Sequence, residues 1–187
     1  MVKTRTPRLN RSDWIAAALS ALQSRGVENI KIVNLAKDLG VTSGSFYWHF
    51  KDLGELLRST LEFWEIELTD RISERYRSFD GNATDRLFNL MVDVIRYDAA
   101  APDHAISVWA KNDDHACQVY ERTLQKRFDF ARWMFEQNGF EAHEAQLRGR
   151  LFVAYLMGES STNLKAQADW EHVLKRQLDI LTARPEI

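Results

Sequence analysis

The sequence predicts an all-α protein, with an N-terminal three-helix head, a larger helical bundle and about nine helices in total. Apolar residues recur at helical spacings through most of the 187 residues, and no segment alternates with the period of a strand. Only eight Gly and three Pro are present, which leaves little room for long loops. A content of 45% hydrophobic and 28% charged residues is enough for a buried core and excludes a disordered chain.

The first predicted helix covers residues 11–25. Asn10 is a favourable N-cap, and Gly26 stands where a helix commonly ends. Between them, apolar residues fall at i, i+1, i+4, i+5 and i+8, which places them in one stripe along the helix. The stripe consists of Trp14, Ile15, Ala18, Leu19 and Leu22.

The next two predicted helices, 32–39 and 41–51, are joined by a tight turn at Gly40, a residue that readily adopts positive φ. Residues 41–51 read V-T-S-G-S-F-Y-W-H-F-K, and Phe46 and Phe50 stand one helical turn apart on the same side. Two helices joined by a short turn that contains Gly form a helix-turn-helix. We therefore assign residues 1–51 to a helix-turn-helix head.

The remainder, residues 52–187, is predicted to form a helical body. Asp52 can cap a fourth helix over about residues 53–78, which is longer than a three-helix head needs and so links the head to the body. The turn Asp80-Gly81-Asn82 follows this helix. Five more helices are expected at residues 83–97, 103–111, 113–138 (capped by Asn112), 142–161 and 168–181.

Charge is distributed unevenly between these two regions. Residues 1–51 hold eight Lys and Arg against three acidic residues, whereas the remainder holds seventeen against twenty-four. A basic head on an acidic body favours binding of nucleic acid by the head, although chance segregation of charge would give the same pattern.

Residues 41–51 carry the clearest chemical signal. With Phe46 and Phe50 in the core, the outward positions hold small hydroxyls, Tyr47, Trp48 and a cation, where a merely soluble helix would carry Glu, Lys and Ala. Exposed aromatic hydroxyls beside a cation suit contact with a phosphate backbone and base edges. The alternative is that Tyr47, Trp48 and His49 only pack against the fourth helix.

Residues 26–51, G-V-E-N-I-K-I-V-N-L-A-K-D-L-G-V-T-S-G-S-F-Y-W-H-F-K, resemble the helix-turn-helix of the tetracycline-repressor (TetR) family. The glycine after the first helix, the L-A-x-x-L-G-V turn and the F-Y-W-H-F-K end match in order and spacing. Lys31 departs from the Thr or Ser that usually opens the second helix, and Leu53 replaces a common lysine. The resemblance implies a DNA-binding transcriptional regulator. By this resemblance, we expect a ligand-responsive repressor that binds a two-fold operator as a homodimer.

The resemblance also implies the residues that contact DNA in the major groove. Thr42, Tyr47, His49 and Lys51 would bind phosphates, and Lys31 would offer one more phosphate contact. Ser43, Gly44 and the edge of Tyr47 would meet bases, and Trp48 would lie against the sugar–phosphate wall or a thymine methyl. The implied DNA-binding set is Lys31, Thr42, Ser43, Gly44, Tyr47, Trp48, His49 and Lys51.

The outward side of the third helix carries no Arg, Asn or Gln, the residues that read guanine or adenine with two hydrogen bonds. We therefore expect specificity to depend on few direct contacts, on thymine methyls and on DNA shape. Lys3, Arg5 and Arg8 in the N-terminal segment could add minor-groove contacts.

By the same resemblance, residues 52–187 form a ligand-binding and dimerisation domain. The expected effector is an apolar or aromatic small molecule, because large apolar walls with a few polar tips are typical of such pockets. Its candidate contacts are Phe63, Phe88, Met91, His104, Trp109, Tyr120, Trp133 and Tyr155. The candidate dimer interface consists of Leu147, Leu151, Ala154, Tyr155, Gly158, Trp170, Leu174 and Leu178. An ordinary core within one chain would explain both sets of apolar residues as well.

No motif indicates an enzyme, a metal site or a cofactor. Asp113, Asp114 and His115 are consecutive, so they point in different directions on a helix, and Cys117 has no sequence partner that would mark it as a nucleophile. The single cysteine excludes a disulfide within the chain, and no apolar run suggests a signal peptide or a membrane span, so we expect a cytoplasmic protein that does not contact membranes. Two other functions remain open: a DNA-binding regulator that activates or is not gated by a ligand, and a helical small-molecule binding protein that does not read DNA.

Overall fold

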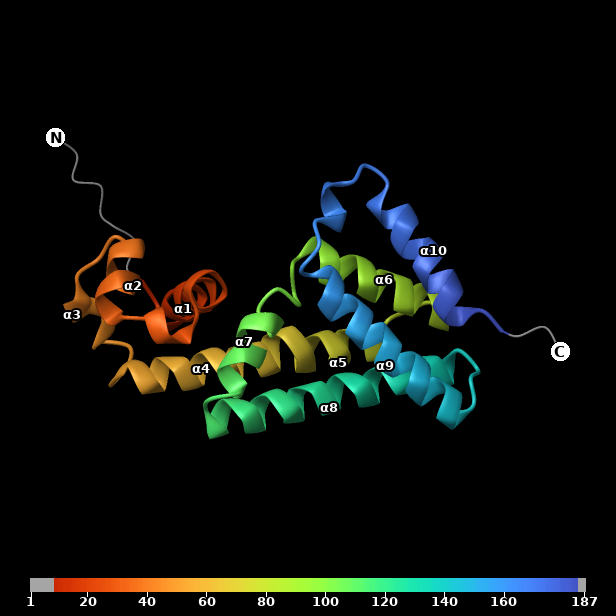
Figure 1. The fold of residues 1–187 in the computed structure, drawn as a ribbon, viewed down its shortest axis with the longest axis horizontal. Coiled ribbons are helices and arrows are strands. Elements are labelled where there is room, and N and C mark those ends of the chain that lie inside the picture. Colours follow the sequence, from red (N-terminus) through yellow and green to blue (C-terminus); the bar gives the residue numbers. More distant parts are fainter. Residues whose placement is uncertain (1–8, 185–187) are drawn as a thin grey trace. The chain divides into compact units, whose positions relative to one another are not determined.

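The structure, a computed structural model, describes residues 9–184, and the regular secondary structure in this range is helical, with turns and loops between the helices (Figure 1). No strand occurs within this range, as predicted for an all-α fold. The chain divides into two compact units, with the boundary between Trp64 and Glu65. The sequence predicted a head that ends earlier, at residue 51. None of the helices in residues 9–184 has both the length and the apolar character that crossing a bilayer requires.

The first unit contains the helix-turn-helix. Its elements are α1 (Arg11–Arg25), the 3-10 turn η1 (Val27–Asn29), α2 (Ile32–Asp38), α3 (Ser43–Phe46) and most of α4 (Leu53–Glu65). Asn10 caps α1 as predicted: its side chain accepts from the Asp13 N–H, and the Asp13 carboxylate accepts from the Asn10 N–H. Gly26 and Gly40 have φ of 74° and 68°, so both turns use the backbone conformation that glycine allows.

The third helix is shorter than predicted. Residues 41–51 were expected to be helical, but α3 ends at Phe46 and turns follow, although the Phe50 N–H still donates to the Phe46 carbonyl at 3.0 Å. The start of α4 explains the early end. The Lys51 N–H donates to the Glu55 carboxylate at 2.8 Å, and Asp52 accepts from the Glu55 N–H at 2.8 Å. Because these capping bonds already belong to α4, α3 cannot extend to residue 51.

Aromatic rings form the core of the first unit. Phe46 and Phe50 are buried as predicted, and Phe46 packs edge-on against Trp14 with ring centroids 5.3 Å apart. Ala18, Leu22, Leu35 and Leu56 are buried in the same unit. The two phenylalanines therefore anchor both ends of the segment that carries Tyr47, Trp48 and His49.

Residues 53–77 are helical without a gap in the sequence, close to the single helix predicted at 53–78. The run changes geometry in its middle: α4 gives way to a π-helical turn, η2 (Ile66–Asp70), before α5 (Arg71–Arg77). Counting α4 and α5 as one helix gives nine α-helices in the described part of the chain. π-Helical turns are rare overall but frequent at functional sites, which makes the contacts of η2 relevant to function.

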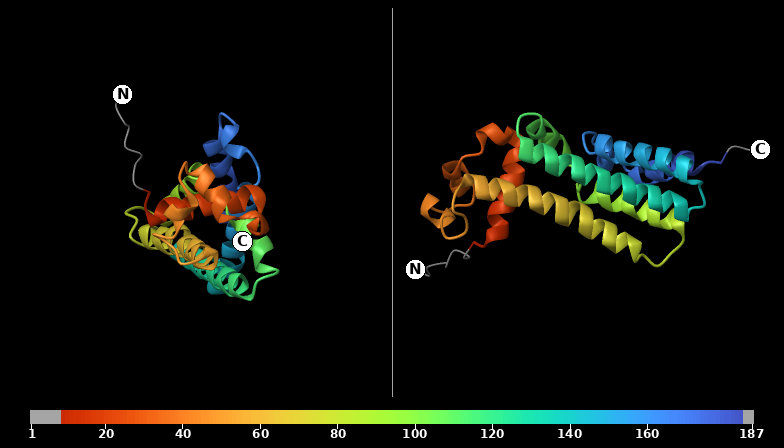
Figure 2. Two further views of the ribbon diagram at one scale, coloured as in Figure 1. Left: turned by 90° about the vertical axis from the view of Figure 1, so that its left-hand side faces the viewer. Right: turned by 90° about the horizontal axis from the view of Figure 1, so that it is seen from below.

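The second unit is a bundle built around α8. Its remaining helices are α6 (Ala83–Arg96), α7 (Asp103–Ala110), α8 (Asp114–Gln137), α9 (Ala142–Glu159) and α10 (Trp170–Thr182), with a 3-10 turn η3 (Leu164–Ala166) before α10. The α8 and α9 helices pack closely along each other (Figures 1 and 2). The predicted cap Asn112 is wrong by one residue, since the Asp113 side chain accepts from the Ala116 N–H at 2.7 Å.

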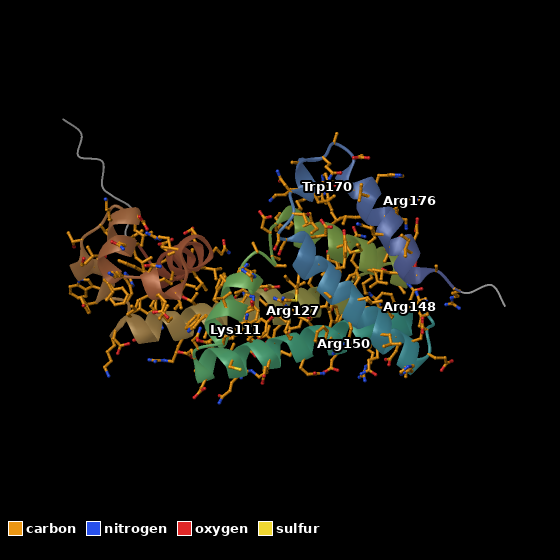
Figure 3. All side chains as sticks on the ribbon, in the orientation of Figure 1. Lys111, Arg127, Arg148, Arg150, Trp170 and Arg176 are labelled. Atoms are coloured by element: carbon orange, nitrogen blue, oxygen red, sulfur yellow. The ribbon has the colours of Figure 1, made fainter. Side chains whose placement is uncertain are left out.

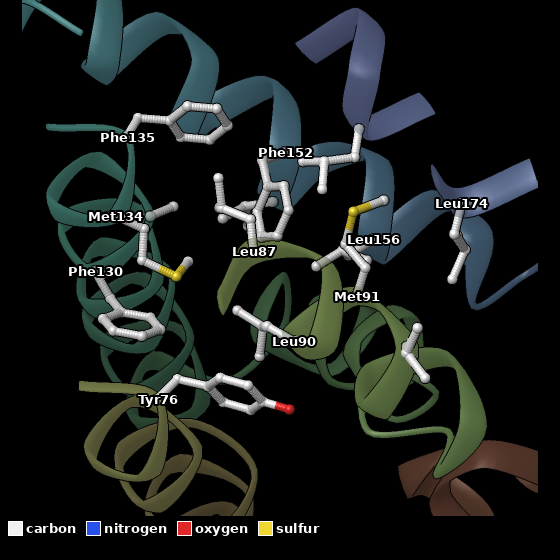
Figure 4. Close-up of a cluster of buried hydrophobic side chains, with 14 of the residues drawn as sticks. Tyr76, Leu87, Leu90, Met91, Phe130, Met134, Phe135, Phe152, Leu156 and Leu174 are labelled. Atoms are coloured by element: carbon white, nitrogen blue, oxygen red, sulfur yellow. The ribbon is translucent and has the colours of Figure 1, made fainter. Parts of the chain in front are cut away.

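A continuous apolar core fills this bundle (Figure 4). Phe135 of α8 meets Phe152 of α9 edge-on, with centroids 5.9 Å apart. Gly149 permits the close approach of these two helices, because a Cβ added there would lie 2.8 Å from the Arg132 backbone nitrogen. Met91, Leu174 and other residues of α6 and α10 close the core on its other sides.

Candidate functional site

The first unit displays two large aromatic side chains at the end of α3. Trp48 is 85% exposed and Tyr47 is 63% exposed, although apolar rings of this size are usually covered. The Tyr47 ring rests edge-on against buried Phe46, with centroids 5.3 Å apart. Their exposure therefore comes from a rigid turn held by the core, and the alternative in which both rings are packed away does not apply.

The other predicted DNA-binding residues also reach the surface. Lys31, Thr42, Gly44 and Lys51 are exposed, and Ser43 and His49 are half-buried. We call these six residues together with Tyr47 and Trp48 the recognition surface. A Cβ added at Gly44 would meet only the Thr42 hydroxyl, at 3.7 Å, so the backbone there is open to an approaching partner. Lys3, Arg5 and Arg8, predicted to reach the minor groove, lie outside the described residues.

Arg11 supports the recognition surface, although it was not among the residues predicted from the sequence. Its guanidinium lies 4.1 Å from the Phe50 ring centroid and donates to the His49 carbonyl at 2.6 Å and to the Ser59 hydroxyl at 2.8 Å. It also pairs with Glu55 at 2.9 Å. The Lys51 N–H, followed by Arg11, lowers the pKa of Glu55. These contacts join residues 38 or more positions apart, which no spacing rule could reveal.

The second unit contains a cavity of about 520 Å³, part of which is open to solvent. Apolar side chains make most of its wall, among them Leu90 on α6, Met134 on α8 and Phe152 on α9. The polar groups of the wall are Thr69 in η2, Ser73 on α5 and Arg127 on α8. A largely apolar wall with a few polar groups is typical of a small-molecule site.

None of the eight predicted ligand contacts lines this cavity. Met91 and Trp109 are buried within packed side chains, and His104 is exposed. The wall is formed instead where small residues such as Ala99 and Ala131 leave space. Large aromatic residues occur in packed cores as well as in pockets, and the aromatic residues of this wall are Phe130 and Phe152, which were not among those predicted. The predicted contacts that do not line the cavity are Phe63, Phe88, Met91, His104, Trp109, Tyr120, Trp133 and Tyr155.

Arg127 is the charged residue of the cavity wall, and it is paired (labelled in Figure 3). Its Nη1 lies 2.5 Å from the carboxylate of Asp103, and its Nε donates to the Thr69 hydroxyl at 2.9 Å. The Asp103 side chain is 2% exposed and that of Arg127 is 14% exposed. A buried pair of this kind has no net charge, so the cavity wall is electrically neutral at this point.

A second group of charges holds the π-helical turn. Both oxygens of Glu65 accept from Arg122, at 2.7 and 2.6 Å, and Lys126 bridges Glu65 and Asp70 at 2.9 and 2.7 Å. Hydrogen bonding from Arg122 outweighs the effect of burial and lowers the pKa of Glu65 from its usual 4.5 to about 2. Together with the bond between Arg127 and Thr69, these contacts tie η2 and the preceding residue, Glu65, to two successive turns of α8.

An apolar stripe on α9 faces outward. Leu147 and Leu151 are 47% and 61% exposed, and Ala154 and Gly158 continue the stripe at helical spacing. Tyr155 and Trp170 are partly buried. The assignment of Leu174 and Leu178 to a dimer interface is wrong, because both are fully buried in the core of a single chain. Within residues 9–184, no three His, Cys, Asp or Glu side chains gather where they could hold a metal ion.

Comparison with known proteins agrees with this geometry. A profile described as "Bacterial regulatory proteins, tetR family" matches residues 15–60, which cover α1 to most of α4. The HTH-type transcriptional regulator BetI of Klebsiella pneumoniae (strain 342) is 26% identical over 184 residues, which cover 91% of this chain and 94% of that protein. AcrR of Shigella flexneri is 29% identical over 85 residues, so the match spans 46% of this chain and only 40% of AcrR.

A solved structure shares the fold of both units. FadR from Bacillus subtilis, a transcriptional regulator determined in complex with stearoyl-CoA, has a TM-score of 0.66 and 17% identity, and the match covers 92% of this chain and 97% of FadR. The helix-turn-helix, the family profile and the relatives lead to the same conclusion. Residues 15–60 carry the DNA-binding domain of the TetR family, and the chain is a TetR-type DNA-binding transcriptional regulator.

Proposed function

We propose that this regulator is a ligand-responsive repressor that binds a two-fold DNA operator as a homodimer in the cytoplasm. The observation that carries the proposal is the apolar cavity of about 520 Å³ in the second unit. Its wall of apolar side chains with a few polar groups has the composition of a small-molecule site.

In the proposed complex, the recognition surface enters the major groove. Tyr47, His49 and Lys51 bind phosphates, and Thr42 and Lys31 add contacts near helix N-termini. Ser43 and Gly44 approach the base edges closely. The exposure of Tyr47 and Trp48 supports this arrangement, because most of the surface of both side chains is left uncovered within their own unit.

The position of the cavity in the sequence supports control by a ligand. Leu68 and Thr69 belong to η2, the turn that directly follows α4, and both line the cavity. A ligand that contacts them shifts the balance between two arrangements of this turn only if it binds one arrangement more tightly. The same difference in affinity then appears as a change in operator affinity.

The apolar stripe on α9 supports a dimer. Leu151 alone is 61% exposed, and Ala154 and Gly158 are small enough to let a second helix approach closely. A two-fold operator requires two copies of the recognition surface, one for each half-site. We therefore assign the stripe Leu147, Leu151, Ala154 and Gly158, with partly buried Tyr155 and Trp170 beside it, to the interface between subunits.

The effector is an apolar small molecule. The wall residues favour this class, and the related fold of FadR binds stearoyl-CoA, a molecule with a long apolar chain. No cofactor is required for such a response.

Two measurements test this function. An operator is first selected from random double-stranded DNA with the purified chain, and its affinity is measured by fluorescence anisotropy. Sequence-specific binding that weakens when an apolar ligand is added supports the proposal, whereas specific binding that no ligand changes leaves an ungated regulator. A reporter gene behind the operator then separates repression from activation by the sign of its response.

The dimer is tested by light scattering coupled to size-exclusion chromatography. The unaltered chain is expected to elute as a dimer and Leu151→Glu as a folded monomer, because a carboxylate on the stripe would be buried unpaired in the interface. Val108→Glu, which changes an exposed apolar residue of α7, is the matched control and should remain dimeric. A monomeric unaltered chain would contradict this part of the proposal.

A further inference from the structure

The charges around the cavity determine which molecules it can accept. Of the side chains that form its wall, only that of Arg127 carries a charge. This cation is already neutralised, since the Asp103 carboxylate lies 2.5 Å from its Nη1 and is 2% exposed. Asp103 is also the first residue of α7, where the helix dipole favours a negative charge.

We propose that the cavity selects neutral apolar molecules with one hydrogen-bonding group, and that Asp103 excludes anions from it by occupying Arg127. The selectivity of the cavity can be tested without DNA. Only the role of this selectivity in gene regulation rests on the proposed ligand control.

Charge balance explains the exclusion of anions. A carboxylate that entered beside Arg127 would share one cation with Asp103, which leaves a net negative charge among apolar side chains. Burial of an uncompensated charge costs several kcal/mol even after the surroundings relax. A cation would meet Arg127 at the wall and suffer the same penalty with the opposite sign.

The charged side chains around η2 do not compensate the charge of a bound ion. Glu65 and Asp70 are balanced by Arg122 and Lys126, so this network also has no net charge. None of these four side chains lines the cavity.

Hydroxyl groups provide the polar contact that a neutral ligand needs. Thr69 accepts from Arg127 Nε, which leaves its own hydroxyl hydrogen to donate to a ligand oxygen. Ser73 adds a second hydroxyl to the wall, one helical turn further along. An alcohol, ether or ketone oxygen at the end of an apolar chain matches this pair, and the rest of the ligand would lie against Leu90, Met134 and Phe152.

The test compares three probes that differ only in the charge of their head group: decanol, decanoate and decylamine. Their affinities for the full-length chain are measured by isothermal titration calorimetry at neutral pH, below the aggregation concentration of each probe. Decanol is expected to bind, and decanoate and decylamine to bind about tenfold more weakly or worse, since each would leave a charge uncompensated. Equal or tighter binding of decanoate, or no binding of decanol, would overturn the inference.

Asp103→Asn tests the cause of this selectivity. The substitution keeps the size of the side chain and removes the negative charge that balances Arg127, so the affinity for decanoate is expected to rise about tenfold or more and that for decanol to change little. Asp129→Asn is the control, because it removes an exposed carboxylate from the same helix as Arg127 and should leave the three affinities unchanged. An unchanged ratio of decanoate to decanol affinity in folded Asp103→Asn would refute the role of Asp103.

Thermal denaturation establishes whether Asp103→Asn folds. If it does not, the comparison of the three probes on the unaltered chain still decides the selectivity. A separate operator titration distinguishes this inference from the proposed function: if decanol binds with the stated selectivity but does not alter operator affinity, ligand control fails and the inference stands.

Discussion

In the first unit, Tyr47 and Trp48 are 63% and 85% exposed. In the second unit, the side chain of Arg127 at the wall of a cavity is only 14% exposed, and that of its partner Asp103 is 2% exposed. The first unit presents apolar rings to the outside, and the second hides charges inside. DNA is a large polyanion that can be contacted only from outside, so its contacts must be exposed. A small ligand is enclosed, so its contacts lie within the fold. In each unit, the site that we propose as functional shows an unusual pattern of exposure: exposed aromatic rings in the first unit and buried charged side chains in the second.

The sharpest contrast lies within one turn of the first unit. Phe46→Ala is expected to lower the free energy of unfolding by about 3–5 kcal/mol, because it removes a fully buried ring that touches Trp14 and Phe50. Trp48→Ala, two residues away, should change it by less than about 0.5 kcal/mol. Urea denaturation measures both. Similar losses for the two variants would mean that Trp48 is structural.

Residues that matter little for stability should matter most for operator binding. Trp48→Ala and Tyr47→Ala are each expected to weaken operator affinity by about 1–3 kcal/mol, or roughly tenfold to a hundredfold, through lost groove contacts. Val108→Ala, which shortens an exposed apolar residue of the second unit, is the control. Anisotropy with the selected operator measures all three. If Trp48→Ala binds as tightly as the control, the recognition surface is misassigned.

The buried charges of the second unit predict how stability depends on pH. The folded-state pKa of Glu65 is about 2, below the usual 4.5, so its ion pairs stabilise the fold fully above pH 4.5 and are lost as the pH falls toward 2. The difference in unfolding free energy between the unaltered chain and Glu65→Gln should therefore be about 1–3 kcal/mol at neutral pH and shrink over this range. Denaturation at a series of pH values checks it. A difference that is constant with pH would show that Glu65 acts through packing alone.

Two glycines of α9 give the smallest expected effect. At Gly149 a Cβ would meet the Arg132 backbone nitrogen at 2.8 Å, whereas at Gly158 it would meet nothing within 4 Å. Gly149→Ala should cost about 1–2 kcal/mol, since the strain of overpacking exceeds the gain in helix propensity. Gly158→Ala should be neutral or slightly stabilising for the single chain. Thermal denaturation compares them, and equal stability would mean that α8 and α9 can separate without cost.

The sequence predicted the first unit better than the second, for a physical reason. Helix caps such as Asn10 and turn glycines such as Gly26 and Gly40 act through neighbours in the chain, so local patterns reveal them. The early end of α3 was missed because the Glu55 carboxylate binds the Lys51 N–H, while Asp52 caps α4 by accepting from the Glu55 N–H. The recognition surface is defined by the residues that the sequence indicated, and its support by Arg11 is what the sequence did not indicate.

The cavity could not be predicted, because it is a property of packing between helices. Its wall depends on small residues such as Ala99 and Ala131, which carry no chemical signal in a sequence. The pairing of Asp103 with Arg127 joins residues 24 positions apart on different helices, and no periodicity connects them. Leu174 and Leu178 match the pattern of an interface as well as that of a core, and only their burial decides between the two.

The division of tasks between the two units is tested most directly by measuring operator affinity with and without a ligand in the cavity. The purified chain is titrated with the selected operator in the absence of decanol and at a concentration of decanol that calorimetry shows to be saturating. We predict that decanol weakens operator affinity about fivefold or more, as is typical of coupling between two sites. Bound decanol with unchanged operator affinity would contradict the account.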